Sequence, residues 1–186
     1  MSSEIRRITT RTKSTRDDWR TPAWVQELFQ TYAKDHDLAT WDPYPSPDSA
    51  FHFCDDQTPI ALADSVTYNP DGTCAPQRAV WCNPPYGRAL LEHSALISRL
   101  MYRHALVVAL VPARPGVRWW CQLAQRDRLV AVPHDRFHFD DGDDPAMFQS
   151  AMIIGGTDAH CAGWADVWRG EAWIARSLPS DMQGRL

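Results

Sequence analysis

Long apolar runs are missing from this sequence. No stretch approaches the roughly 20 consecutive apolar residues that a helix needs to cross a bilayer, and the N-terminus lacks the apolar segment of a signal peptide. We therefore expect a soluble protein that is neither embedded in a membrane nor exported.

Closely spaced cysteine pairs are missing as well. The five cysteines are odd in number and widely separated, and none forms a CxxC pair: Cys54, Cys74, Cys82, Cys121 and Cys161. This pattern supports neither a zinc ribbon nor a disulfide framework. Reduced thiols in a cytoplasm are the expectation.

Several signatures of nucleotide and hydrolase chemistry are also absent. The sequence has no GxGxxG dinucleotide fingerprint, no GxxxxGK[ST] phosphate loop and no GxSxG nucleophile elbow. His134 and His138 have no Cys or third ligand near them in sequence, so we predict no metal site. The acidic residues at 140–144 are better explained as a solvated turn than as a calcium loop.

The composition is that of a globular domain. Hydrophobic residues make up 44% of the 186 residues, and the formal net charge is −4, so the chain as a whole is not basic. Basic residues gather in residues 1–16, which we expect to be a flexible arm. Residues 17–175 are predicted to form one domain, followed by a tail at 176–186.

Hydrophobic periodicity places the main elements. A helix is predicted from Pro22 to about His36 with Thr21 as its N-cap, and further helices over 87–103 and 117–125. Trp164, Trp168 and Trp173 fit either a helix or an aromatic lid. Strands are predicted at 38–41, near 66–68, and at 79–82, 105–111, 129–132, 137–139 and 151–154, the last two forming an antiparallel pair. Alternating strands and helices predict an α/β fold with a mainly parallel sheet and helices on both faces.

A stiff polar segment follows the strand predicted at 79–82. Asn83, Pro84, Pro85 and Tyr86 end that strand, because proline cannot donate to a sheet ladder. In open α/β sheets the carboxyl ends of strands are where ligands bind. An amide, an exposed carbonyl and an aromatic ring together can hold a flat base that carries an exocyclic amine. Asp42 and Pro43 follow the strand predicted at 38–41 in the same way.

The four residues match the [DNS]-Pro-Pro-[Tyr/Phe] motif of amino-methyltransferases that use S-adenosylmethionine. Across residues 17–155 the chain resembles the phage-type DNA N6-adenine methyltransferase (Dam) family. The matching segments, in order, are Trp19-x-Thr21-Pro22, Asp42-Pro43, the segment Val80 to Gly87, Val111-Pro112-Ala113-Arg114, Trp119-Trp120, Arg136-Phe137-His138-Phe139 and Phe148-Gln149-Ser150-Ala151.

The resemblance implies a single-domain, Rossmann-like methyltransferase fold with S-adenosylmethionine as cofactor and DNA as partner. For a phage-encoded enzyme it implies the cytoplasm of a bacterial host. It makes Asn83, Pro84, Pro85 and Tyr86 the catalytic residues, which fits their chemistry. The Asn83 side-chain oxygen and the Pro84 carbonyl can accept the two hydrogens of adenine N6, while the Tyr86 ring stacks on the base.

The resemblance also implies contacts with the cofactor and with DNA. Thr21, Pro22, Asp42 and Pro43 would lie at the methionine end of the cofactor, with Ser46 in a proline-rich loop where many methyltransferases have glycines. Asp64 is a candidate for the adenine or ribose of the cofactor. The DNA-contacting candidates, which would meet phosphates from the cleft side, are Arg88, Arg114 and Arg118.

Two other functions fit parts of the same pattern. A protein glutamine methyltransferase acts on a similar planar amine, but that class usually has a glycine-rich first loop and an added domain, and neither is seen here. A fold of the same class that binds nucleic acid or cofactor without turnover is the alternative outside enzymes.

Overall fold

The computed structural model describes residues 20–44, 78–125, 128–139 and 145–176. The predicted basic arm, the strand near 66–68, the acidic turn at 140–144 and nearly all of the predicted tail lie outside the described residues. The described elements, in chain order, are α1 (Ala23–Asp35), β1 (Ala39–Trp41), β2 (Arg78–Cys82), α3 (Leu90–Leu100), β3 (Leu106–Pro112), α4 (Arg118–Leu123), β4 (Leu129–Pro133), β5 (Ser150–Gly156), α5 (Asp158–Val167) and β6 (Ala172–Arg176).

One six-stranded sheet runs through the molecule in the order β1-β2-β3-β5-β4-β6. The strands β1, β2 and β3 pair in parallel, whereas β5 is antiparallel to both β3 and β4, and β6 is antiparallel to β4. The predicted α/β class is confirmed, but the prediction of a mainly parallel sheet is wrong. All seven residues of β3 are buried, as its apolar sequence predicted, yet burial on both faces does not determine the direction of a neighbouring strand.

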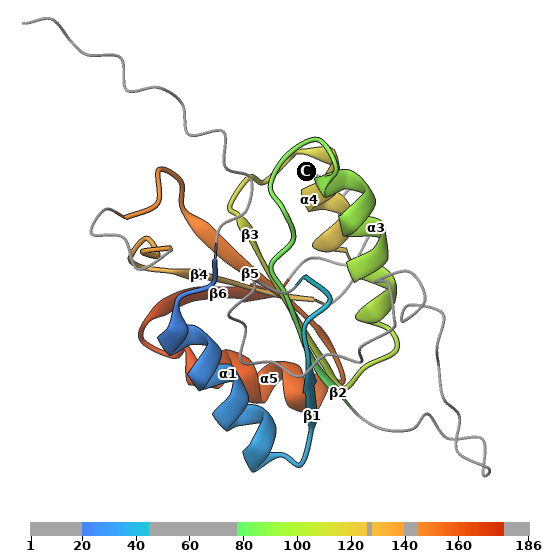
Figure 1. The fold of residues 1–186 in the computed structure, drawn as a ribbon, viewed down its shortest axis with the longest axis vertical. Coiled ribbons are helices and arrows are strands. Elements are labelled where there is room, and N and C mark those ends of the chain that lie inside the picture. Colours follow the sequence, from blue (N-terminus) through green and yellow to red (C-terminus); the bar gives the residue numbers. More distant parts are fainter. Residues whose placement is uncertain (1–19, 45–77, 126–127, 140–144, 177–186) are drawn as a thin grey trace, which may run out of the picture.

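Helices cover both faces of the sheet, as predicted. Figure 1 shows α1 and α5 on one face and α3 and α4 on the other. Alternate residues of β3 divide between the two cores: Leu106, Val108 and Leu110 pack with α1 and α5, whereas Val107 and Val111 pack with α3 and α4. This alternation is the two-residue period of a strand that is covered on both sides.

Two local predictions at the sheet edge are wrong. Thr21 does not cap α1, because Pro22 occupies the N-cap position and no side-chain capping hydrogen bond forms. The Thr21 hydroxyl instead accepts a hydrogen bond from Trp81 Nε1 over 3.0 Å. Residues 137–139 form no strand. Phe137 and Phe139 are buried, so their alternation reflects packing of an extended segment that has no strand partner.

The three late tryptophans belong to different elements. Trp164 is buried in α5, Trp168 caps the carboxyl end of that helix, and Trp173 lies on β6 with 61% of its surface exposed. None of the helices in the described ranges is long and apolar enough to span a membrane. Those ranges also contain no group of three His, Cys, Asp or Glu side chains arranged to hold a metal ion.

Candidate active site

The polar motif follows the carboxyl end of β2. β2 ends at Cys82, and residues 83–86 continue without helix or strand until a turn leads into α3. Pro84 is buried and Pro85 is exposed, while Asn83 is half-buried. Because neither proline can donate to a neighbouring strand, pairing stops here and the segment leaves the sheet.

Tyr86 turns back towards the sheet and holds Asn83. Its hydroxyl donates to Asn83 Oδ1 over 2.9 Å and lies 3.3 Å from the carbonyl oxygen of Leu110 on β3. Only 7% of Tyr86 is exposed, and burial raises the pKa of its hydroxyl, which therefore remains a protonated donor. Its ring meets the edge of Phe148 at 5.6 Å. The hydroxyl thus orients the Asn83 amide from inside the protein.

Asp42 ends β1 next to this motif. β1 and β2 are parallel with Trp41 opposite Val80, so their carboxyl ends are adjacent. Asp42 is also close enough to contribute to a raised pKa of the Cys82 thiol, after the larger effect of burial. The backbone N–H of Tyr44 donates to Asp42 Oδ1 over 2.7 Å. The sequence prediction that these two strand ends lie together therefore holds in the structure.

The Asp42 carboxyl is in an unusual state for an acid. Only 3% of the residue is exposed. Burial raises the pKa of Asp42 to about 7, although the hydrogen bond from Tyr44 acts in the opposite direction. Among the described residues, no cationic side chain forms a salt bridge with it. A buried carboxyl of this kind would be stabilised in its charged form by a cationic group that bound beside it.

Tyr44 and His93 form a contact that the sequence gave no sign of. The Tyr44 hydroxyl and His93 Nδ1 share a hydrogen bond of 3.2 Å, and their rings meet edge to face at 5.0 Å. Burial lowers the pKa of His93. Because His93 lies on α3, the contact ties the segment after β1 to the helix that follows the polar motif. The two residues are 49 positions apart, so no local pattern could have paired them.

The start of α1 is attached to β2 through Thr21. Only 8% of Thr21 is exposed, and its hydroxyl accepts from the fully buried indole of Trp81. Phe29, further along α1, meets the same indole at 5.2 Å. Pro22 and Pro43 are buried as well. Thr21 therefore has a structural role at the strand that carries the motif, whatever it binds.

The predicted DNA-contacting arginines share one edge of the sheet. Arg88 lies in the turn between Tyr86 and α3, Arg114 follows β3, and Arg118 begins α4, and all three are exposed. The structure thus brings together the predicted residues that follow β1, β2 and β3, together with Thr21 and Pro22. Ser46 and Asp64 lie outside the described residues.

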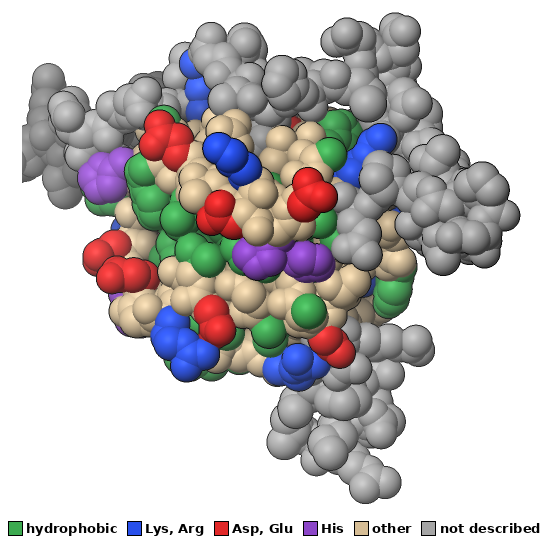
Figure 2. All heavy atoms as spheres, turned by 90° about the horizontal axis from the view of Figure 1, so that it is seen from below, with side chains coloured by type: hydrophobic (Ala, Val, Ile, Leu, Met, Phe, Trp, Pro, Cys, Tyr) green, Lys and Arg blue, Asp and Glu red, His purple; other side chains and the backbone are tan. Residues whose placement is uncertain are grey.

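Figure 2 shows the molecule from below the view of Figure 1. Among the side chains that the structure describes on this face, acidic, basic and histidine residues are interspersed and no single sign of charge gathers. The rings of His36 and His160 lie 5.6 Å apart.

The site combines the Asn83 amide at the end of one strand with the buried carboxyl of Asp42 at the end of the next. Such a set can hold a planar amine on one side and a cationic group on the other. Neither curated proteins nor solved structures gave a match to the chain. The family model for DNA N-6-adenine-methyltransferase (Dam) matches residues 8–152, which include every residue of this site. The chain therefore belongs to the DNA N-6-adenine-methyltransferase (Dam) family.

Proposed function

We propose that the protein transfers a methyl group from S-adenosylmethionine to the exocyclic N6 of an adenine that has been flipped out of DNA. The observation that carries this proposal is the Asn83 amide at the end of β2, held in place by the buried hydroxyl of Tyr86. Family membership supplies adenine in DNA as the acceptor. A base paired inside a duplex cannot reach a side chain at a strand end, so it must leave the stack.

The acceptor chemistry follows from the two oxygens at the motif. Adenine N6 is a poor nucleophile because its lone pair is delocalised into the ring. Asn83 Oδ1 and the Pro84 carbonyl accept the two N6 hydrogens and draw them aside, which localises the lone pair on nitrogen. The rigid backbone at Pro84 and Pro85 holds both acceptors in position, so the effect is one of placement.

The Tyr86 hydroxyl has two acceptors within reach. A hydroxyl has one proton, so it donates either to Asn83 Oδ1 or to the Leu110 carbonyl oxygen. In the free protein the bond to Asn83 fixes the amide. A shift of the proton towards Leu110 would remove this donor from Asn83 Oδ1 when the substrate binds.

On the donor side, Asp42 fits a cofactor that carries a cationic ammonium. S-adenosylmethionine supplies a methyl group on a sulfonium: the S–C bond breaks as the N–C bond forms, its electron pair remains on sulfur, and N6 then releases a proton to solvent. The buried Asp42 carboxyl, with no cationic partner among the described residues, suits the ammonium at the methionine end. We assign Thr21, Pro22, Pro43, Ser46 and Asp64 to the same cofactor.

The exposed arginines after β2 and β3 suit the DNA backbone. Arg88, Arg114 and Arg118 lie at the edge of the sheet where the base would enter. Guanidinium groups at this edge would hold phosphates without reading sequence. We therefore assign base discrimination mainly to the residues of the motif, Asn83 to Tyr86.

The proposal is tested by comparing DNA with protein as the acceptor of the methyl group. The protein is incubated with methyl-labelled S-adenosylmethionine and either unmethylated DNA or a glutamine-containing protein. The proposal predicts label in DNA alone. Label in the protein acceptor would support the glutamine alternative, whereas calorimetric binding of the cofactor with no label in either acceptor would support a binding module without turnover.

A further inference from the structure

A cavity of about 740 Å³ lies outside the site described above. Three parts of the chain line it: the first turns of α1, the segment that follows β4, and the chain between α5 and β6. Its volume is in the range of small-molecule sites in proteins. None of the residues assigned to catalysis, cofactor or phosphate contact lines it.

The cavity is at the same edge of the sheet as the polar motif. β4 and β3 are both antiparallel to β5, so they run in the same direction. Residues 134–138 therefore leave the sheet at the edge where Asn83 and Asp42 lie. Thr21, three residues before Trp24 of the cavity, is bonded to Trp81 of β2.

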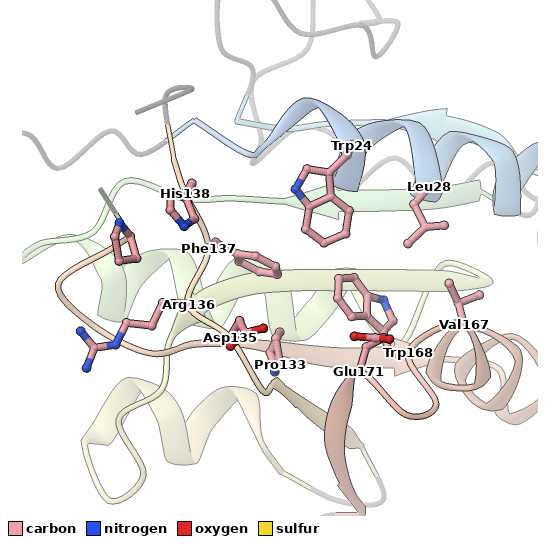
Figure 3. A pocket seen from close by; sticks show the side chains of 11 residues that line it. Trp24, Leu28, Pro133, Asp135, Arg136, Phe137, His138, Val167, Trp168 and Glu171 are labelled. Carbon is pink, nitrogen blue, oxygen red and sulfur yellow. The ribbon is translucent and has the colours of Figure 1, made fainter. Parts of the chain in front are cut away.

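Aromatic rings form the wall of the cavity. Figure 3 shows Trp24 facing Phe137 and Trp168. Both of these rings lie 5.8 Å from the Trp24 indole, measured between centroids. Phe137 and Trp168 are buried, but 52% of Trp24 is exposed. A half-exposed indole that is held by two neighbouring rings is a suitable surface on which a planar ring can stack.

A row of aromatic contacts links this wall to the motif. Tyr86 meets Phe148 at 5.6 Å, Phe148 meets Phe139 at 6.1 Å, and Phe139 meets Phe137 at 6.1 Å. Each ring in the row contacts the next, so packed aromatic side chains connect the wall of the cavity to the motif.

The charges around the cavity indicate which part of a nucleotide it suits. Asp135 and Glu171 line it and are exposed. Their carboxylates repel phosphate but accept hydrogen bonds from an amine. Arg136 also lines it, and Figure 3 shows its guanidinium extending away from the aromatic rings. A base would lie inside, with its phosphate on the side of Arg136.

We propose that this cavity binds a nucleobase adjacent to the target adenine, and that it favours bases with an exocyclic amine. The base stacks on Trp24, and its amine donates to Asp135 or Glu171. This inference rests on the proposed function for the identity of the strand, but it concerns residues that have no part in methyl transfer.

The test measures DNA binding by the full chain without cofactor, from the anisotropy of dye-labelled single strands. Trp24→Ala should weaken binding about tenfold, the loss expected for one stacked base, while Trp24→Phe should retain most of it. Trp173→Ala is the matched control, since Trp173 is also exposed but does not line the cavity. Equal affinities for wild type, Trp24→Ala and Trp173→Ala would overturn the proposal.

The preference for an amine is tested in an Asn83→Ala background, in which the proposed adenine site has lost its side-chain acceptor. Oligodeoxycytidine should bind more tightly than oligothymidine of equal length, and the double variant Asp135→Ala with Glu171→Ala, which lacks both side-chain acceptors, should remove the difference. No difference between the two strands would overturn the base assignment. A change in sedimentation of the free protein caused by Trp24→Ala would instead make this face a contact between two copies of the chain.

Failure of this inference is separable from failure of the proposed function. If the protein methylates DNA but Trp24→Ala does not change DNA binding, only the assignment of the cavity is contradicted. If Trp24→Ala weakens DNA binding but the protein methylates no acceptor, only the proposed reaction is contradicted. Unchanged calorimetric binding of S-adenosylmethionine by Trp24→Ala guards against an indirect effect through the nearby Thr21.

Discussion

The two halves of the sheet differ in how they build their edge. In the parallel half, β1, β2 and β3 each end in a short polar segment, and these segments carry Asp42, Asn83 and Arg114. In the antiparallel half, β5, β4 and β6 end alternately at opposite edges, and a cavity forms between α1, the segment after β4 and the chain before β6. One half gathers polar groups and the other gathers aromatic rings.

Strand direction explains this difference. Parallel strands bring every carboxyl end to one edge, so the residues that follow them converge without help from distant segments. Antiparallel strands bring a carboxyl end beside an amino end, and the space between them is closed by side chains from elsewhere in the chain. We therefore expect reaction chemistry to depend on the parallel half, and affinity and stability to depend on both.

The largest effect should follow Asn83→Ala. Loss of the amide oxygen removes a preorganised acceptor from the reacting amine, so turnover should fall at least about 10²- to 10³-fold. Calorimetric affinity for S-adenosylmethionine should be unchanged. The matched amide in the other half is Gln149, whose Nε2 donates to the Pro133 carbonyl over 2.6 Å. Gln149→Ala should lower the free energy of unfolding and leave turnover near that of the wild type. Equal losses of turnover in Asn83→Ala and Gln149→Ala would contradict the assignment of the reaction to the parallel half of the sheet.

Asp42→Asn should change how stability depends on pH. The pKa of Asp42 is raised from 3.8 to about 7 by burial, so between these values the folded chain retains a proton that the unfolded chain has lost. The stability from this group is complete below pH 3.8 and is lost as the pH rises through 7, by about 1.4 kcal/mol per pH unit.

Denaturant titrations of wild type and Asp42→Asn at acidic and alkaline pH measure this contribution of Asp42 to the free energy of unfolding. The variant should gain stability relative to wild type by a few kcal/mol on going from pH 4 to pH 8. Asp35→Asn, at an exposed position in α1, controls for the loss of one charge. A constant difference between wild type and Asp42→Asn across this range would contradict the account. Saturating S-adenosylmethionine should reduce the wild-type loss if its ammonium binds Asp42.

Thr21→Val should destabilise the parallel half by a smaller amount. The substitution keeps the volume but leaves the buried Trp81 Nε1 without its acceptor, which costs about 1–3 kcal/mol. Urea denaturation measures the loss. Adding Trp81→Phe removes the orphaned donor, so the double variant should lose less than the sum of the two single variants. Strict additivity would show that the bond contributes nothing.

Tyr86→Phe should have the smallest effect among these variants. The ring still packs on Phe148, but Asn83 loses the donor that fixes its amide. Loss of one neutral hydrogen bond, about 1 kcal/mol, predicts a reduction of turnover by less than about tenfold. Single-turnover kinetics measure the reduction. A loss as large as that of Asn83→Ala would mean that the hydroxyl, and not the amide, is the group the reaction needs.

The parallel half was the more predictable of the two. Asn83 to Tyr86 are contiguous, and their prolines mark the end of a strand, so the position of the motif follows from local chemistry. Asp42 was placed by the same reasoning. The Thr21 hydroxyl was misassigned to a helix cap because its true partner, Trp81, is 60 residues away. Residue types that suit a cap also suit a long-range hydrogen bond.

The strand directions and the cavity of the antiparallel half could not be predicted from the sequence in the same way. The apolar residues 106–112 and 150–156 show that β3 and β5 are buried, but burial carries no information on direction. Alternation at Phe137 and Phe139 predicted a strand, whereas the two rings pack into the aromatic core without one. The cavity draws on Trp24, Asp135 and Glu171, which are far apart in sequence and share no motif.

The identity of the methylated nucleoside tests the central claim most directly. Unmethylated DNA is incubated with the protein and methyl-labelled S-adenosylmethionine, digested to nucleosides and separated. An Asn83 amide that holds the adenine amine predicts label in N6-methyl-2′-deoxyadenosine, formed at least about 10²-fold more slowly when Asn83→Ala replaces the wild type. Label only in N4-methyl-2′-deoxycytidine, or undiminished labelling by Asn83→Ala, would contradict it.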